Sequence, residues 1–277
     1  MLLTPRYDGA PVLEIEGPVG DPSIMLVRQQ RRFAEVLATF GPDQWASPTR
    51  CARWSVQDTV VHLVGANELW RTSVTAGRAG APTRLFEFFD PVTTPPRLVD
   101  AVEGWTRFEA LARYVAAADA VAGAVSGLDG AGWSVTGESP LGHVALRLVL
   151  LHALWDSWIH ERDVLLPLGL APVLEPDEVV ACLAYAAALG PALLAAGGSV
   201  RRGTLAVDGT EPEAQIVVDV GSTVLLRLDT AAAGAARLTG RAVDLIEGLS
   251  FRAPLTADVA ATDRWLLSGL DAAFDVA

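Results

Sequence analysis

Polar residues that could bind a metal recur every four positions in the stretch LHALWDSWIHERDV, residues 151–164. On a helix at roughly 100° per residue, His152, Asp156, His160 and Asp163 fall within about one quarter of the circumference. A histidine and a carboxylate four residues apart present a nitrogen and an oxygen to one point above the helix. This suits a divalent metal of the zinc type when another element adds a third ligand. The alternative is an ordinary solvated face, although such faces favour Lys, Glu and Arg.

The third ligand is expected from a neighbouring helix, and His62 is the candidate. In CARWSVQDTVVHLVGANELW (51–70), Ser55 is a good N-cap, Asp58 completes a capping pattern, and apolar residues continue at helical spacing. His62 thus lies on a helix whose other residues are mostly apolar. A lone histidine in such a place is more often a hydrogen-bonded core residue, so its role depends on the helix beside it.

The roles of other polar residues near these motifs are either undecided from the sequence or structural. His152 is a partner of the site, a catalytic base or an ordinary polar residue at the end of the bundle. Asp163 either orients His160 by bonding the free nitrogen of the His160 ring, or caps the end of the helix poorly, since an acid near a C-terminus opposes the helix dipole. We interpret His143 as structural and Cys51 as a small buried residue, because no base is evident beside Cys51 in the sequence.

Composition excludes several classes of protein. The net charge is -12 and the pI about 4.7, which argues against a nucleic-acid partner, because such a binder needs a basic face. All 21 basic residues are arginine, so Schiff-base chemistry and a phosphate-loop lysine are both excluded. Two cysteines, Cys51 and Cys182, are too few for a disulfide framework or a cysteine-built zinc site, and they indicate a reducing cytoplasm.

The N-terminal stretch MLLTPRYDGAPVLEIEG has no apolar core flanked by positive charge, and we expect no later run to be long and charge-free enough to cross a bilayer. We therefore expect a cytoplasmic protein without a membrane partner, either a monomer or a homodimer. Its 277 residues, 51% of them hydrophobic, are enough for two compact units.

The first half has the pattern of a helical bundle. Apolar residues at helical spacing, capping residues and Pro/Gly stops mark the ends of the segments. The expected helices are 22–40, the helix through His62, a long pattern over 98–128 interrupted near Ala118, and a helix capped by Ser139 with Pro140 at its first position, which ends at Pro167.

The second half mixes helices and strands. One helix over 175–196 is followed by GTLAVDG, AQIVVDVG and STVLLRLD, short alternating runs separated by Gly, Asp and Ser that are typical of antiparallel hairpins. Two further helical patterns, RAVDLIEGLSF and DRWLLSGLDAAF, complete the chain. The expected fold class is α+β, with a four-helix bundle at 1–170 and a small α+β domain at 171–277.

The motifs CARWSVQDTVVHL and DSWIHERDV together resemble the mycothiol-dependent maleylpyruvate isomerase family, whose N-terminal domain is a DinB-like four-helix bundle. That family follows a tryptophan-led helix start with a metal-ligand histidine, matched here by Trp54 and His62. It then places a carboxylate and a histidine four residues apart on the last bundle helix, where this chain has Asp156 and His160.

The resemblance extends to the second half. The family's C-terminal domain is similar to sterol-carrier (SCP2-like) folds, and LTGRAVDLIEGLSFR, residues 238–252, resembles its signature helix. The chain departs from the family twice. The shorter Asp156 stands where the isomerase has a glutamate ligand, and HERD puts Arg162 one position later than usual.

The resemblance implies a divalent metal, zinc foremost, held by His62, Asp156 and His160, and a mycothiol thiolate that this metal activates. The implied activity is a transferase or isomerase reaction on a small organic substrate, with the low-molecular-weight thiol as second partner. Two alternatives stay open: a non-catalytic carrier of an apolar ligand with a structural metal, and a hydrolase or lyase that uses metal-bound water. Candidates for holding an anionic substrate are Arg227, Arg241 and Arg252.

Overall fold

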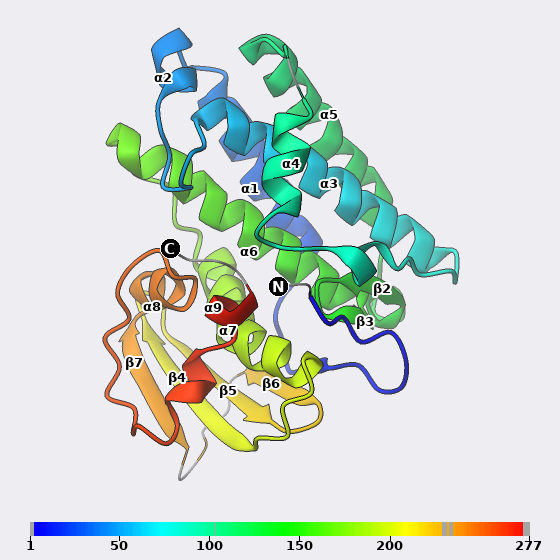
Figure 1. Cartoon of the computed structure of the whole chain (residues 1–277), viewed down its shortest axis with the longest axis vertical. Helices are drawn as coiled ribbons and strands as arrows, with labels where there is room; N and C mark the ends of the chain where they lie inside the picture. Colours follow the sequence, from blue (N-terminus) through cyan, green and yellow to red (C-terminus); the bar gives the residue numbers. More distant parts are fainter. Residues whose placement is uncertain (1–2, 103, 229–231, 233–234, 274–277) are drawn as a thin grey trace.

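Four long helices pack side by side in the first half of the chain: α1 (Pro22–Leu37), α3 (Val56–Arg78), α5 (Arg107–Val125) and α6 (Leu146–Leu165) (Figure 1). The structure is a computed structural model that describes residues 3–102, 104–228, 232 and 235–273. A sheet with its own helices follows the bundle (Figure 1). The predicted α+β class, with a helical N-terminal part and a C-terminal sheet, is confirmed.

The predicted start of α3 is also confirmed. The Ser55 hydroxyl accepts a hydrogen bond from the Asp58 amide at 3.2 Å, and the Asp58 carboxylate accepts one from the Ser55 amide at 2.9 Å. This capping box satisfies two amide groups that a helix start leaves unpaired. It thereby fixes where the turn that carries His62 begins.

The helical pattern over 98–128 is interrupted at a different place from the one predicted. Residues 94–100 form a separate helix, α4 (Thr94–Asp100), and the chain leaves helical geometry before α5 rather than near Ala118. Gly104 has a left-handed backbone, with φ at 82°, and the Thr106 hydroxyl caps α5 by accepting from the Glu109 amide. Ala118 lies on the buried side of an unbroken α5.

The predicted cap at Ser139 is wrong, because a β-hairpin precedes α6. Ser139 ends β2 (Thr136–Ser139), which pairs with β3 (Gly142–Ala145), and α6 begins only after Ala145. The N-terminal segment crosses this hairpin: the Arg6 amide donates to the Leu141 carbonyl, and the His143 amide donates to the Arg6 carbonyl at 2.9 Å. A contact from so far away in the sequence leaves no local pattern.

Gly142 leaves no room for a side chain at this crossing. Its φ is 97°, and a Cβ would lie 2.1 Å from the Arg6 carbonyl oxygen. We expect Gly142→Ala to lower the free energy of unfolding by about 2–4 kcal/mol, from left-handed strain plus overlap. Denaturant titration measures this. The matched control is Gly123→Ala in α5, where a Cβ meets nothing within 4 Å and helix propensity should raise stability slightly. Equal effects of the two changes would contradict the prediction.

The sheet in the second half is mixed. The strand order is β1-β6-β5-β4-β7, and the predicted antiparallel pairing of the three central strands is observed. The two edge strands were not predicted, and both pair in parallel, β1 with β6 and β7 with β4. The strands are β1 (Leu13–Glu16), β4 (Gly203–Thr210), β5 (Ala214–Val220), β6 (Val224–Leu228) and β7 (Ala236–Arg241).

Helix α7 and several shorter helices complete the fold. The predicted domain boundary near residue 170 falls in the loop before α7, yet β1, near the N-terminus, pairs with a strand of the second half. The division into domains 1–170 and 171–277 therefore stays a prediction. The remaining elements are α2 (Pro42–Ala46), η1 (Leu85–Phe88), η2 (Gly132–Ser134), η3 (Leu166–Leu168), α7 (Pro176–Ala196), α8 (Ala242–Leu249), η4 (Arg264–Leu267) and α9 (Leu270–Ala273).

Helix α7 joins the two halves. It packs on α6 on one side and on β5 and β6 on the other (Figure 1). By length and composition α7 could cross a membrane, with a hydropathy of 2.1 in its most apolar window, so the expectation that no run is apolar enough is wrong. In this structure 83% of that window is buried, as in the core helix of a soluble protein.

The polar side of α6 is buried by several segments. His152 is 5% exposed and contacts Tyr185 of α7, while His160 (7% exposed) and the fully buried Asp163 are covered by the segment before α3, by α3 and by the segment after α8. The alternative of a solvated polar face is therefore wrong. Polar side chains inside the protein need partners.

Candidate functional site

The three predicted ligands meet between two packed helices. His62 comes from α3, Asp156 and His160 come from α6, and one nitrogen or oxygen of each lies within 4.8 Å of the others. The Trp54 ring packs against the His62 ring, with centroids 5.0 Å apart, and restricts its orientation. Two nitrogens and one oxygen at this separation form a donor set that a single divalent ion could bridge.

His160 presents its two nitrogens to different partners. Nε2 lies 3.6 Å from an Asp156 oxygen, on the side of the three ligands, whereas Nδ1 lies 3.1 Å from Asp163 Oδ2. We assign the Nδ1 proton to the hydrogen bond with the Asp163 carboxylate, which leaves the Nε2 lone pair for an ion. Asp163 thus orients His160, which is the first of its two predicted roles.

Asp156 and His62 are both suited to a cation. No described residue donates a hydrogen bond to Asp156, whose side chain is only 17% exposed, and burial raises the pKa of its carboxyl group. Burial lowers the pKa of His62 to about 3, so its imidazole is neutral. A neutral imidazole beside a carboxylate without a donor matches the needs of a metal ion.

Cys51 is the residue that sequence reasoning missed. Its sulfur lies 3.2 Å from Asp163 Oδ2 and 3.5 Å from His160 Nδ1, and it lines the same cavity as the ligands. The interpretation of Cys51 as a small buried residue is therefore wrong, because the side chain is half-buried and its polar neighbours come from α6 rather than from the adjacent sequence. Cys51, His160 and Asp163 form a second group with metal-ligand spacing.

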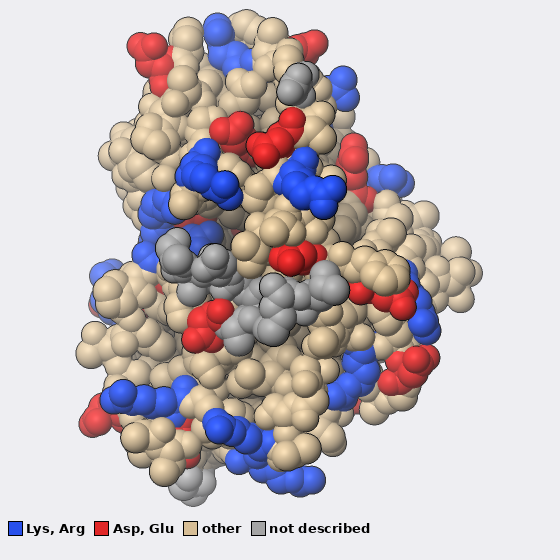
Figure 2. Space-filling model, in the orientation of Figure 1, with Lys and Arg blue, Asp and Glu red and all other residues tan. Residues whose placement is uncertain are grey.

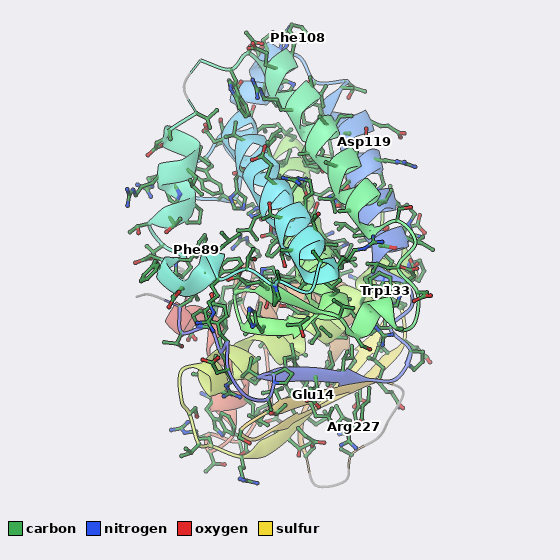
Figure 3. All side chains as sticks on the ribbon, turned by 90° about the vertical axis from the view of Figure 1, so that its right-hand side faces the viewer. Glu14, Phe89, Phe108, Asp119, Trp133 and Arg227 are labelled. Carbon is green, nitrogen blue, oxygen red and sulfur yellow. The ribbon has the colours of Figure 1, made fainter. Side chains whose placement is uncertain are left out.

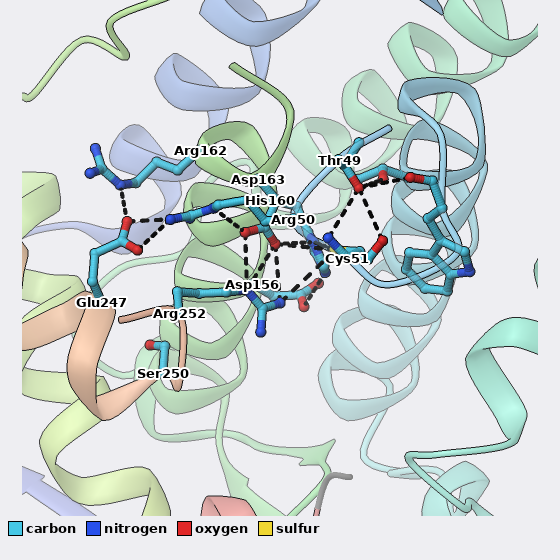
Figure 4. A network of polar contacts seen from close by, with 12 residues as sticks. Thr49, Arg50, Cys51, Asp156, His160, Arg162, Asp163, Glu247, Ser250 and Arg252 are labelled. Carbon is cyan, nitrogen blue, oxygen red and sulfur yellow. Dashed lines mark hydrogen bonds and ion pairs between the residues drawn. The ribbon is translucent and has the colours of Figure 1, made fainter. Parts of the chain in front are cut away.

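Two guanidinium groups make the second group the poorer cation site. Arg50 Nε donates to Asp163 at 2.9 Å, and Arg252 donates to both Asp163 oxygens at 3.0 to 3.1 Å (Figure 4). Burial raises the pKa of Asp163, but the hydrogen bond with His160 and the charge of Arg252 outweigh it and hold that pKa well below its usual range. The group that contains His62 and Asp156 has no arginine bound to its carboxylate among the described residues.

The same arginines tie the sheet part of the chain to the bundle. Glu247 on α8 accepts hydrogen bonds from Arg50 at 2.6 Å and from Arg162 at 2.5 Å, and Arg252 follows the same helix (Figure 4). Of the candidates for an anionic substrate, only Arg252 lines the cavity; Arg227 pairs with Asp219 and Arg241 with Glu211 on the sheet.

The three ligands line a cavity of about 1100 Å³. Its wall comes from α3, α4, α6 and the segment after α8, and it includes His152, Trp70 and Trp155. His152 therefore shares the cavity with the ligands. His143 lies outside it, with Nε2 2.9 Å from the Thr83 carbonyl oxygen, in agreement with a structural role.

Residues 26–165, just over half of the chain, match a family model described as the mycothiol maleylpyruvate isomerase N-terminal domain. The chain belongs to this family. Two uncharacterized proteins of Mycobacterium tuberculosis, from strains CDC 1551 / Oshkosh and ATCC 25618 / H37Rv, are each 32% identical to it over 172 residues. That alignment covers 62% of this chain and 81% of each relative.

The likeness in fold reaches beyond the family domain. A crystal structure of the mycothiol-dependent maleylpyruvate isomerase superposes with a TM-score of 0.59 at 11% identity, over 86% of this chain and 90% of that chain. A histidine-to-alanine variant of that isomerase gives the same TM-score at 10% identity. The sheet part of the chain thus shares the fold of the isomerase as well.

Within the family, Asp156 is the departure that bears on the site. The resemblance implied a glutamate at this place, and the aspartate side chain is one methylene shorter. One Asp156 oxygen still lies within 4.8 Å of the ligand nitrogens of both histidines. The close packing of α3 on α6 therefore keeps the shorter carboxylate within reach of the histidines.

Proposed function

We propose that this protein is a metal-dependent transferase or isomerase that uses mycothiol and a small organic substrate. His62, Asp156 and His160 hold the divalent metal, and zinc suits a set of two imidazoles and one carboxylate. When bound, such a metal lowers the pKa of a coordinated thiol and makes thiolate available near neutral pH. The observation that carries this proposal is the approach of the three ligand atoms, within 4.8 Å, at the wall of a large cavity.

The surrounding residues position the ligands and the reactants. Asp163 fixes the His160 ring through Nδ1, and Arg50 and Arg252 fix Asp163 in turn. The cavity, about 1100 Å³, exceeds the roughly 300–1000 Å³ of common small-molecule sites, so a thiol and a second substrate fit together. Membership of the family supports mycothiol as the thiol.

The setting of the reaction is part of the proposal. We propose a cytoplasmic monomer or homodimer, with neither nucleic acid nor membrane as partner. Cys51 and Cys182 are both free thiols, which suits a reducing compartment. Figure 2 shows arginines and acidic residues interspersed on one face of the molecule, without a continuous basic surface among the described residues there.

The test replaces the native ion with cobalt and follows the sulfur-to-metal charge-transfer absorption while mycothiol, and then cysteine, is added. We expect saturable absorption with mycothiol in the wild-type protein and in a His143→Ala control. It should disappear in His62→Ala, because that variant lacks one ligand. Bound cobalt whose spectrum no thiol changes would overturn the thiol reaction and favour metal-bound water or ligand carriage.

A further inference from the structure

One end of the cavity is built of aromatic rings around His152. The Trp70 ring from α3 and the Trp155 ring from α6 lie 5.0 and 5.4 Å from the imidazole, centroid to centroid. Phe86 from η1 stacks on Trp70 at 6.1 Å. We name these four side chains, His152, Trp70, Trp155 and Phe86, the aromatic lobe. All four line the cavity, and none has a role in the proposed metal chemistry.

The aromatic lobe lies at a definite distance from the proposed metal ligands. His152 precedes His160 by eight residues on α6, so the two are roughly 12 Å apart along the helix axis at 1.5 Å per residue. The lobe lies at the end of the bundle near the sheet: Phe89, which Figure 3 labels there, packs on Phe86 at 5.1 Å, whereas Phe108 marks the opposite end. A substrate that reaches both places must carry an extended group.

The hydrogen bond between His152 and Tyr185 defines what the lobe offers a ligand. His152 Nδ1 lies 2.8 Å from the Tyr185 hydroxyl oxygen, and both side chains are buried. Burial lowers the pKa of His152 to about 3 and raises the pKa of Tyr185, so the pair is a neutral imidazole and a protonated phenol. Tyr185 has no other hydrogen-bond partner among the described residues. Its proton is therefore donated to Nδ1, because a buried hydroxyl that donates to nothing is costly.

This arrangement leaves the second imidazole proton on Nε2. Nε2 makes no hydrogen bond with a described residue. It is also absent from the set of unpartnered side-chain atoms that are sealed from solvent, so part of its surface is accessible. Because His152 lines the cavity, we place this N–H at the cavity surface. A neutral donor among rings recognises an oxygen acceptor on an apolar molecule, as in many small-molecule sites.

We propose that the aromatic lobe binds an uncharged, ring-bearing part of the substrate, and that His152 Nε2–H donates a hydrogen bond to a neutral oxygen on it. This inference rests on the proposed function and names its substrate class. None of the four side chains of the lobe carries a charge. A small dicarboxylate would have to leave water for aromatic rings without gaining an ion pair there, which is unfavourable.

The test measures the binding of three probes by calorimetry. Acetophenone has a ring and a neutral carbonyl, ethylbenzene has the ring alone, and maleate has charge without a ring. We expect wild-type protein to bind acetophenone about 5- to 10-fold more tightly than ethylbenzene, the effect of one hydrogen bond, and to bind maleate least. In His152→Phe, acetophenone affinity should fall to that of ethylbenzene while ethylbenzene affinity is kept.

Controls separate this role from a merely structural one. If His152→Phe fails to fold because Tyr185 loses its partner, the double variant with Tyr185→Phe removes both polar groups and is measured instead. His143→Gln, outside the cavity, should change neither affinity. Equal wild-type affinity for acetophenone and ethylbenzene, preference for maleate, or absence of acetophenone binding would overturn the proposal.

Failure of the proposed function would have a different signature. His62→Ala removes a proposed metal ligand but leaves the aromatic lobe intact, so acetophenone should bind this variant as it binds the wild type. Protein that binds neither metal nor thiol but still prefers acetophenone would overturn the metal chemistry alone. Protein that binds metal and thiol but not acetophenone would overturn the substrate class alone.

Discussion

His160→Ala is expected to abolish metal binding, taking the content from roughly one divalent ion per chain to none, an affinity loss of about 100-fold or more. The change removes the imidazole, which is one of the three ligands. Elemental analysis of protein purified without added metal, and again after incubation with zinc, measures the content.

His143→Ala is the matched control for this loss. His143 lies outside the cavity and contacts the Thr83 carbonyl, so its removal should leave the metal content unchanged. Equal metal loss in His143→Ala and His160→Ala would show that the ion is bound elsewhere. An intermediate loss in His152→Ala would add His152 to the residues that orient the ligands, although we expect none at its distance along α6.

Asp163→Asn is expected to lower the free energy of unfolding by about 3–5 kcal/mol, because it leaves Arg252 without its counter-charge and leaves Arg50 with Glu247 alone. Asp163 is fully buried, while the side chains of Arg50 and Arg252 are only 22% and 25% exposed. The amide of asparagine keeps the shape but replaces an acceptor oxygen with a donor facing guanidinium groups. Denaturant titration followed by circular dichroism measures the change.

An exposed ion pair provides the comparison for Asp163. Asp8 pairs with Arg84 at 3.3 Å, and their side chains are 91% and 48% exposed. We expect Asp8→Asn to cost less than about 1 kcal/mol, because water already screens that pair. A similarly small effect of Asp163→Asn would mean that water compensates Arg50 and Arg252, and that the network contributes little to stability.

Local signals in the sequence were enough to identify the residues that meet in the candidate site. The capping box at Ser55 fixed the helix of His62, and the four-residue spacing placed Asp156 and His160 on one side of α6. Whether that side faced water could not be predicted, because α6 is apolar over most of its circumference. The answer depends on tertiary contacts with His62, Cys51 and the segment of Arg252.

Contacts between distant segments explain what the sequence analysis missed. Cys51 meets His160 and Arg252 only after three separate segments have come together, and no periodicity records such a meeting. The hairpin before α6 was mistaken for a helix cap because Ser139 and Pro140 are typical of helix starts. The backbone of Arg6, which crosses at Gly142, decides the outcome there.

The strand β1 has a consequence for how the protein must be made. Leu13 pairs with Val224 and Glu16 with Arg227, so the first strand to leave the ribosome finds its partner only after most of the chain has been synthesised. Contacts of such long sequence separation slow folding and leave a sheet edge open meanwhile. The bundle, whose helices are contiguous in sequence, can form while β1 waits. A nascent chain of this protein therefore carries an unpaired β1 until β6 has been synthesised.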